Sequence, residues 1–415
     1  MPKNWAGTHE YTAPRIATAT TQDEVRAIVA EGGPVHALGT RHSFTDLPDT
    51  AGTLIDLVGL EGGYRLDEQA GTVSVAGGTR YGVLAQWLDA RGLALHNLGS
   101  LPHISVAGAT ATATHGSGNR NGVLTSAVRG IRYVGADAEV HEVREGDADF
   151  PAVAVGLGAF GIVTEVTLAV EPTYRVRQDI YQGVSWDAAL QRFDELTGAG
   201  YSVSVFTRWI DEAIGDVWVK TRLENDDDAV NDVLLDGARQ VEANPLANLD
   251  DITELGGVPG PWMLRLPHFR LDGTPSFGDE IQSEYFVARS DAPAALRAVR
   301  RLGASIEPHL LVSELRTAAS DELWLSGAYE RDFLAIHFTW RNDPAGVLGV
   351  LPLIEEALAP FAARPHWGKL HTFDAAAIAR VHPRIADARR VFERLDPEAR
   401  FVNAHLLRLG VREAR

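Results

Sequence analysis

Residues 95–118 have the sequence LHNLGSLPHISVAGATATATHGSG, a run of small and hydroxyl-bearing residues without an acidic residue, lysine or arginine. An ordinary helix or strand would need larger apolar side chains to bury. The glycines in this run let the backbone approach a ligand closely, and the Ser and Thr side chains offer hydrogen-bond donors. This composition favours a cradle for a flat, polar-edged ligand that carries phosphate, although a glycine-rich surface loop would have the same composition.

Length and composition describe a soluble globular protein that is larger than one hydrophobic core usually organises. With 415 residues, the chain is expected to form two domains. The longest apolar run, residues 152–163, is shorter than the ~20 residues of a membrane helix and is interrupted by glycines. The first residues contain no apolar signal core, so we expect a cytoplasmic protein without a membrane partner.

Charge and cysteine content exclude several classes of site. The formal net charge of −18 argues against a nucleic-acid partner. There is no cysteine, which excludes disulfides, thiolate nucleophiles, cysteine zinc sites and cysteinyl cofactor linkages. A covalently held cofactor would therefore need another side chain. We expect no metal centre and a monomer.

A helix is predicted to begin at the capping box Thr21-Gln22-Asp23-Glu24, and a strand is predicted at 35–38. A second candidate for ligand binding follows this strand. Residues 39–44 have the sequence GTRHSF, which presents several backbone amides in a row. This pattern favours a nest for a pyrophosphate, with Arg41 adding positive charge. His42 taken alone is more typical of a surface histidine.

Residues 156–161, GLGAFG, match the G-x-G-x-x-G fingerprint of a dinucleotide-binding turn. That turn must open a helix, whereas residues 162–170 alternate and are rich in β-branched side chains, which predicts a strand. We therefore reject a Rossmann site and expect these glycines to bring backbone against a flat ligand, with Ile162 and Val163 near its edge. Other strands are predicted at 53–57, at 72–76 and in a hairpin over 128–143, and a helix at 81–89.

The character of the sequence changes near Pro172, where we place a domain boundary. In the strand predicted at 309–316, the period of two puts Glu314 and Arg316 on one face together with Leu310 and Val312. Such a polar face is typical of a sheet that is solvated on one side. Alternatively, the sheet roofs a polar cavity, and Arg316 keeps Glu314 ionised by pairing with it.

The strand predicted at 333–340 has the same two-sided character. Its apolar residues at 334, 336, 338 and 340 face one way, and His337 and Thr339 face the other. The loop 364–369 that follows a predicted helix adds two groups able to handle protons, His366 and Lys369.

Six separated stretches, in this order along the chain, resemble the flavoprotein superfamily of vanillyl-alcohol oxidase and p-cresol methylhydroxylase (PCMH), and within it the bacterial alditol oxidases that act on xylitol and sorbitol. They are GTRHSF at 39–44, SLPHISVAG at 100–108, THGSG at 114–118, ELRT at 314–317, HFTW at 337–340 and RPHWGK at 364–369. The likeness extends over essentially the whole chain.

The resemblance implies an α+β, two-domain fold of the FAD-binding PCMH type. Residues 1–172 would form the FAD-binding domain, completed by the C-terminal segment 376–415, and residues 173–375 would form a mixed α/β substrate domain that caps the flavin. It also implies FAD joined covalently through a ring nitrogen of His42. The other implied cofactor-binding residues are Ala37, Leu38, Gly39, Thr40, Arg41, Ser43, Ser100, Ser105, Gly108, Thr112, Ala113, Thr114, His115, Val163 and His366.

The resemblance further implies oxidation of the terminal primary hydroxyl of an alditol to the aldose, with O2 reduced to H2O2. The implied substrate-binding residues are Ser100, Glu314, Arg316, Thr339 and Lys369, and the implied catalytic residues are Arg316, Lys369 and His337. A polyol is a row of uncharged hydroxyls, so its site needs several matched donors and acceptors, because each unsatisfied buried partner costs ~1–3 kcal/mol.

Two alternatives remain open at this point: an aldonolactone oxidase or dehydrogenase with the same flavin cradle, and a catalytically silent flavin- or sugar-binding protein. Two positions depart from the resemblance. Gly99 stands where related sequences carry alanine, and its missing Cβ leaves room for dioxygen, which favours an oxidase. Arg41 replaces a small residue, which affects only the details of pyrophosphate contact.

Overall fold

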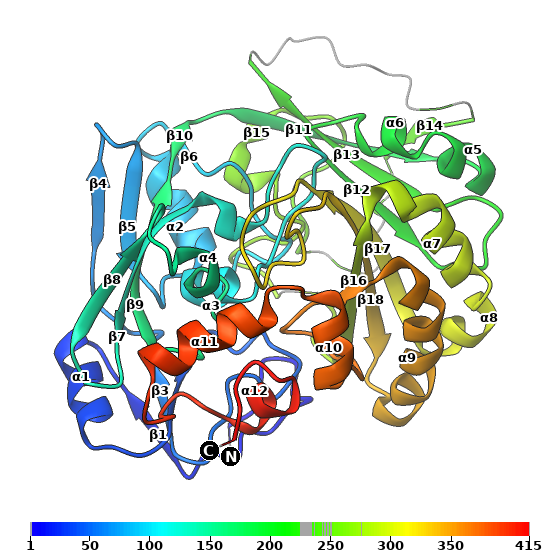
Figure 1. Ribbon diagram of the computed structural model, residues 1–415. Helices are drawn as coiled ribbons and strands as arrows, with labels where there is room; N and C mark the ends of the chain where they lie inside the picture. The colour runs from blue at the N-terminus through cyan, green and yellow to red at the C-terminus, as the bar shows by residue number, and fades with distance from the viewer. Residues whose placement is uncertain are drawn as a thin grey trace.

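The computed structural model describes residues 2–414 apart from 225–234, 236, 243, 245, 247, 248, 250 and 275. Its strands form two groups. Figure 1 shows the strands of the first 172 residues on one side of the molecule and a large sheet with its covering helices on the other. We call these the N-terminal lobe and the cap lobe. The chain therefore combines helices with two separate sheet systems, as the predicted α+β class requires.

The N-terminal lobe contains a parallel and an antiparallel sheet. The parallel sheet has the order β1-β3-β2 and the antiparallel sheet the order β4-β5-β9-β7-β8, while β6 and β10 form a separate pair. The bounds are β1 Arg15–Thr18, β2 Val35–Leu38, β3 Thr53–Asp56, β4 Tyr64–Asp67, β5 Thr72–Ala76, β6 Leu93–Ala94, β7 Val128–Val134, β8 Val140–Arg144, β9 Ile162–Ala169 and β10 Glu171–Pro172. The strand predicted after the glycine motif is β9, so the rejection of a Rossmann turn is confirmed.

Short helices connect these strands, and local sequence explains where they begin. The capping box predicted at Thr21 and Glu24 is present at the start of α1, whose apolar face is buried. The helices of this lobe are α1 Gln22–Ala30, α2 Tyr81–Asp89, α3 Val106–Ala111, the 3₁₀ turn η1 Leu124–Ala127 and α4 Phe150–Val153.

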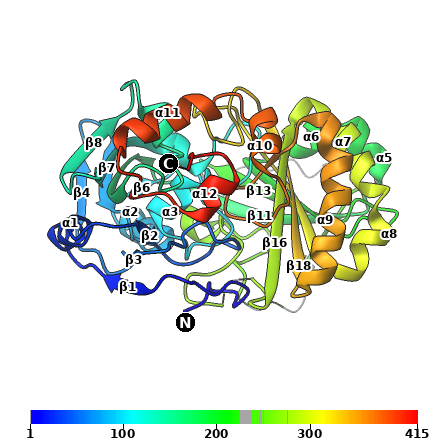
Figure 2. The ribbon, with the colours of Figure 1, turned by 60° about the horizontal axis from the view of Figure 1, so that its bottom comes forward.

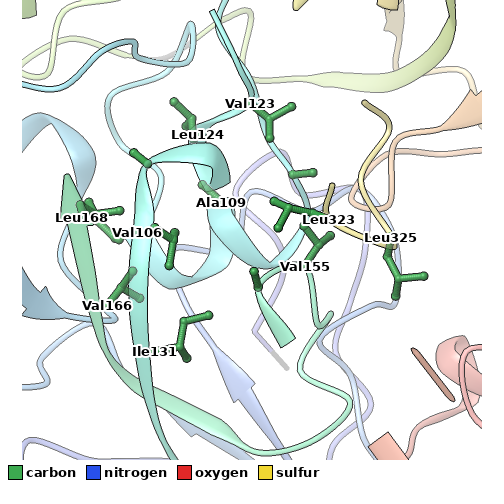
Figure 3. Packing of buried hydrophobic residues seen from close by; sticks show 14 of the residues in the cluster. Val106, Ala109, Val123, Leu124, Ile131, Val155, Val166, Leu168, Leu323 and Leu325 are labelled. Carbon is green, nitrogen blue, oxygen red and sulfur yellow. The ribbon is translucent and has the colours of Figure 1, made fainter. Parts of the chain in front are cut away.

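The opening run does contain a regular element, contrary to the expectation that it lacks an ordinary helix. Helix α3 is short, and it buries Val106, Ala109 and Thr110. Figure 3 shows Val106 and Ala109 packed beside Ile131 of β7 and Val166 of β9. Small side chains suffice here because the helix lies close against the sheet, and this packing places the run firmly on the core.

The cap lobe is built on one sheet with the order β14-β11-β13-β12-β17-β18-β16-β19, to which β15 adds beside β11. The bounds are β11 Arg175–Gln182, β12 Ser202–Thr207, β13 Asp216–Leu223, β14 Arg239–Val241, β15 Gly260–Pro261, β16 Glu280–Ala288, β17 Leu310–Ala318, β18 Phe333–Arg341 and β19 Arg364–Pro365. Every pairing in this sheet is antiparallel.

Helices cover only one face of this sheet, as Figure 2 shows. Alternate residues of β18, from Leu334 to Trp340, pack under those helices in one apolar cluster, so His337 and Thr339 face the other way, as predicted. The helices of this lobe are α5 Trp186–Gln191, α6 Phe193–Thr197, η2 Trp262–Leu264, η3 Arg289–Asp291, α7 Ala292–Arg300, α8 Gly303–Ile306, η4 Glu307–His309, α9 Pro344–Leu358 and η5 Ala359–Phe361.

One prediction about β17 is wrong. Leu310 does not share a face with Glu314 and Arg316, because the pairing of β17 with β18 shifts register between Leu310 and Val312. The irregularity adds one residue, which turns Leu310 into the apolar cluster under the helices while Val312 stays on the opposite face. A bulge of this kind leaves no mark on the alternation of apolar residues.

The segment 344–361, which contains α9, is long and apolar enough by composition to cross a membrane. Val347, Val350, Leu351, Ile354 and Leu358 are nevertheless buried in the core beneath the sheet. This packing accounts for one side of the helix, while Leu348 and Leu353 are exposed on the other.

The last part of the chain returns to the N-terminal lobe. It contains α10 Ala375–Val381, α11 Ile385–Leu395 and α12 Ala404–Arg408. Phe392 lies in the core around α3, and Phe401 lies in the cluster beneath α1. Arg412 is almost fully buried, where it pairs with Asp396 at 3.0 Å and donates to the carbonyl of Ala159. These contacts support the proposal that residues 376–415 complete the domain formed by residues 1–172.

Candidate active site

A cavity of about 270 Å³ lies between the two lobes. One wall is formed by two backbone stretches of the N-terminal lobe, 36–44 and 99–115, which we call the cradle. Residues 157–163 close one end of this wall. The opposite wall, which we call the roof, is the helix-free face of the cap sheet, with side chains from β16, β17 and β18.

Nearly all residues predicted to bind a cofactor or substrate line this cavity. From the cofactor set these are Ala37, Leu38, Gly39, Thr40, Arg41, His42, Ser43, Ser100, Ser105, Gly108, Thr112, Thr114, His115, Val163 and His366. From the substrate and catalytic sets they are Ser100, Glu314, Arg316, His337, Thr339 and Lys369. The half-solvated alternative for the cap sheet is wrong, because Glu314, Arg316, His337 and Thr339 are all buried.

Two expected contacts are absent. Ala113 has a positive φ of 52° that turns its side chain into the hydrophobic core, where it is 2% exposed. Ile162 is buried beneath α1, and only its neighbour Val163 lines the cavity. Both side chains pack in the core and support the backbone of the cradle.

The loop 40–43 offers a set of free backbone donors. Among the described residues, none accepts a hydrogen bond from the N–H groups of Thr40, Arg41, His42 and Ser43. Arg41 has a positive φ of 65°, which bends the loop so that successive N–H groups converge. Converging free amides form an anion-binding nest, as a pyrophosphate requires.

The Arg41 side chain has a partner that the sequence did not predict. Its guanidinium donates to the carboxylate of Asp56 at 2.9 Å, at the end of β3. This ion pair offsets part of the positive charge that Arg41 brings to the cavity, and a contribution of its side chain to anion binding remains a prediction.

The two stretches of the cradle are tied together at Thr40. The Ser105 N–H donates to Thr40 Oγ1 at 3.0 Å, and Thr40 Oγ1 lies 3.1 Å from Nδ1 of His42. The two stretches also approach closely at Gly39, where a Cβ would lie 2.6 Å from Ser105 Oγ and would make that hydroxyl rotate away. The contact holds His42 at a fixed place along the wall.

The His42 ring is a neutral imidazole. Burial lowers its pKa to about 3, and the neighbouring His103 and Arg80 act in the same direction. The indole of Trp5 packs against it with ring centroids 5.6 Å apart. An unprotonated, positioned imidazole keeps a nucleophilic lone pair at neutral pH, which suits bond formation to an electrophilic carbon.

On the roof, Arg316 lies between two buried carboxylates. Its Nη2 is 3.3 Å from Glu284 Oε1 and its Nε is 3.5 Å from Glu314 Oε1, while Nη1 donates to Ser100 Oγ at 2.9 Å. Burial alone would raise the pKa of Glu314, but Arg316 and His268 hold it well below its usual range. The predicted pairing of Arg316 with Glu314 is present, and it joins the roof to the cradle at Ser100.

The sequence-based prediction missed Glu284, which is the most connected carboxylate of the site. It accepts a hydrogen bond from Lys369 Nζ at 2.7 Å and lies 3.3 Å from Nε2 of His115. Burial would raise its pKa, but the Lys369 ammonium and its other cationic neighbours hold it well below the usual range. Glu280, Gln282 and Glu284 alternate along β16, so a polar face was visible in the sequence of this strand as well.

The hydrogen bonds of two roof histidines define their protonation. Gln282 Oε1 lies 3.2 Å from Nε2 of His337, and because an amide oxygen only accepts, the proton is on Nε2. His337 Nδ1 then carries a lone pair, and no described residue donates to it. Burial and Lys369 lower the pKa of His337 to about 3, so the ring is neutral. In His366, Nδ1 accepts the N–H of Gly368 at 3.0 Å, which leaves Nε2–H as a donor.

Together these groups form a site that suits a bound FAD. The nest at 40–43 matches a pyrophosphate, the neutral His42 lies along the same wall, and the stretch around Val163 offers an apolar edge. The roof then places uncharged and charged hydrogen-bonding groups opposite the cradle. Among the described residues, no group of acidic and histidine side chains is arranged to hold a metal ion.

Comparisons with known proteins agree with this geometry. A family model described as FAD binding domain matches residues 13–144, and one described as D-arabinono-1,4-lactone oxidase matches residues 279–409. The chain is 42% identical over 410 residues to an alditol oxidase of Streptomyces, covering 97% of each chain. It is 30% identical over 431 residues to an L-gulono-1,4-lactone dehydrogenase of Mycobacterium tuberculosis, covering 98% of each.

A similar fold occurs in a solved cholesterol oxidase from B. sterolicum. The TM-score is 0.77 at 13% identity, and the match covers 98% of this chain and 96% of that chain. At this identity the comparison concerns the fold alone.

Proposed function

The chain belongs to the vanillyl-alcohol oxidase and p-cresol methylhydroxylase superfamily of FAD-binding flavoproteins, and from this premise we propose that it oxidises the terminal primary hydroxyl of an alditol such as xylitol or sorbitol. The product is the aldose, and O2 is reduced to H2O2.

The polar groups of the two walls carry this proposal, because donors and acceptors lie together in a cavity whose surface is otherwise mostly apolar. Glu314 accepts hydrogen bonds, Thr339 and Ser100 both donate and accept, and Arg316 and Lys369 donate. A row of hydroxyl groups alternates between donor and acceptor in the same way. A buried site of this kind rejects molecules that leave its groups unpaired, since each such group costs ~1–3 kcal/mol.

The charges of the site favour loss of the hydroxyl proton. Lys369 and Arg316 stabilise negative charge on the substrate oxygen as its proton leaves. His337 lines the same cavity, but its Nδ1 is shielded from solvent and burial lowers its pKa to about 3, so this ring is a weak base at neutral pH. When bound, the flavin accepts the hydride that leaves the carbon and passes the electrons to dioxygen.

We propose that His42 joins the flavin covalently through a ring nitrogen. The low pKa of the imidazole and the lack of cysteine in the chain support this attachment. Denatured protein run on a gel is expected to show flavin fluorescence that migrates with the band. The variant His42→Ala should lose this signal, and a signal that persists would contradict the attachment.

The function is tested by a peroxide-coupled screen of polyols. We expect H2O2 to form with xylitol or sorbitol. With analogues that lack the hydroxyls at the oxidised end, H2O2 formation should fall to background. An enzyme that turns over an aldonolactone faster than any polyol would contradict the proposal.

A lactone substrate is the second candidate, because residues 279–409 match the family model of D-arabinono-1,4-lactone oxidase. The higher identity to the alditol oxidase over the full chain favours the polyol. Mixing the protein with substrate in the absence of oxygen distinguishes both enzymes from a catalytically silent flavin-binding protein. In an enzyme the substrate reduces the flavin and bleaches its absorbance, whereas in a silent protein the absorbance stays unchanged. A monomeric state and a cytoplasmic location remain predictions.

A further inference from the structure

Two buried groups beside Glu314 take no part in the mechanism described so far, although one of them, His268, also lines the cavity. Lys220 on β13 is fully buried, and His268 in the loop after η2 is 4% exposed. Lys220 Nζ lies 3.1 Å from His268 Nδ1, and His268 Nε2 lies 2.7 Å from Glu314 Oε1. A continuous chain of hydrogen bonds therefore runs from the cap core to a side chain that lines the cavity.

The partners fix which nitrogen of His268 carries the proton. The carboxylate of Glu314 can only accept, so its 2.7 Å contact with His268 puts the proton of the ring on Nε2. Nδ1 is then unprotonated and accepts from Lys220 Nζ, which also donates to the carbonyl oxygens of Leu266 and Pro267. Burial lowers the pKa of Lys220 well below its usual value, but a neutral amine donates these bonds as well. The proton of the neutral ring is on Nε2 and is donated to Glu314.

The neutral state of His268 agrees with its surroundings. Burial lowers its pKa to about 4, and the positive charge of Lys220 acts in the same direction. The indole of Trp218 stacks on the ring, with centroids 4.5 Å apart and planes at 25°. The ring can therefore neither ionise at neutral pH nor rotate freely.

Both described contacts of Glu314 are made by the same oxygen. His268 Nε2 and Arg316 Nε each meet Oε1, and no described residue donates a hydrogen bond to Oε2. Glu314 lines the cavity, so Oε2 is the oxygen left for a ligand. The backbone N–H of His268 also donates to the carbonyl of Ser100 at 3.1 Å, which connects the same loop to a second substrate-binding residue.

We propose that Lys220 and His268 are positioning residues for substrate recognition: Lys220 holds Nδ1 of His268 in place, and His268 donates from Nε2 to Oε1 of Glu314 so that Oε2 accepts a hydrogen bond from a substrate hydroxyl. This inference rests on the proposed function, in which Glu314 binds the polyol. Lys220 and His268 therefore affect substrate affinity, and they act through Glu314.

Two amide variants separate this role from a role in packing. In His268→Gln, the amide nitrogen can occupy the place of Nε2 and still donate to Glu314. In His268→Asn, the shorter side chain reaches only the place of Nδ1, so Glu314 loses its donor. Both variants remove the ring that stacks on Trp218, so each serves as the packing control for the other.

We expect the KM of His268→Gln for the best polyol to stay within about threefold of the wild type, and that of His268→Asn to rise roughly 10-fold to 100-fold, as for loss of a charge-assisted hydrogen bond. The value of kcat should change less than KM, because the contact serves the bound substrate and the transition state alike. Equal KM values for the two variants, or a larger rise in the Gln variant, would overturn the proposal.

The tautomer is measured on the wild-type holoenzyme without substrate, by long-range ¹H–¹⁵N NMR of protein labelled at histidine. The resonances of His268 are assigned by their absence from the spectrum of either variant. We expect a protonated Nε2 and an unprotonated Nδ1. A ring protonated on Nδ1, or on both nitrogens, would overturn the proposal. This measurement stands even if no polyol is oxidised, an outcome that would refute the proposed function alone.

Discussion

Replacing Glu284 by Gln should shift the pH dependence of catalysis through Lys369. The carboxylate lies 2.7 Å from Lys369 Nζ, and both side chains are shielded from solvent. Burial lowers the pKa of Lys369, while Glu284 raises it and so keeps the amine protonated. Gln has nearly the same shape as Glu but no charge, so the variant removes the opposing charge with little change in packing.

The size of the effect follows from the contact. An opposite charge within ~4–6 Å typically moves a pKa by about 1–3 units. Without it, Lys369 loses its proton about 1–3 pH units lower than in the wild type. Because the mechanism needs the ammonium, activity falls as pH rises through this pKa. The alkaline limb of kcat/KM should therefore move to lower pH by that amount, while the acidic side changes little.

The measurement is a profile of kcat/KM against pH, which reports groups of the free enzyme. Glu280→Gln is the matched control, because Glu280 is buried on the same strand but bonds to Ser276 and Gln282. Its alkaline limb should stay close to that of the wild type. If the limb of Glu284→Gln coincides with the wild type, or if both variants shift equally, the ion pair does not set the protonation of Lys369.

Three further substitutions test the cradle. Gly39→Ala places a Cβ 2.6 Å from Ser105 Oγ, a contact that rotation of the hydroxyl relieves, so bound FAD, measured by flavin absorbance per protein, should decrease only slightly. Gly99→Ala meets no described atom closer than 3.5 Å, so thermal stability should be unchanged, while reoxidation of the reduced enzyme by O2 in stopped flow should slow. Arg41→Met removes an ion pair with Asp56 that is about a third exposed on the arginine side; stability should fall by less than about 1 kcal/mol and FAD content should stay the same.

The sequence was sufficient to predict elements whose signals are local. The capping box of α1, the alternation of β18 and the β-branched run of β9 each determine structure through neighbours within a few residues. The residues around the cavity were found mainly through the resemblance to known flavoproteins, because their types in isolation are equally typical of loops and solvated sheets.

Features that depend on distant partners were missed. Glu284 and His268 matter because Lys369, Lys220 and Glu314 meet them from other strands, and no spacing along the chain encodes such a meeting. The ion pair of Arg41 with Asp56 was missed for the same reason, since Asp56 comes near Arg41 only when β2 and β3 pair. The bulge in β17 likewise depends on its neighbour strand, not on its own sequence.

The return of residues 385–412 to the N-terminal lobe affects how the protein is made. During synthesis the first 172 residues leave the ribosome while their remaining partners, Phe392, Phe401 and Arg412 among them, are still untranslated. The whole cap lobe is translated in between, so the contacts that finish the FAD-binding half are among the last to form. If residues 376–415 complete the FAD-binding domain as proposed, we expect stable loading of the cofactor to come late in translation.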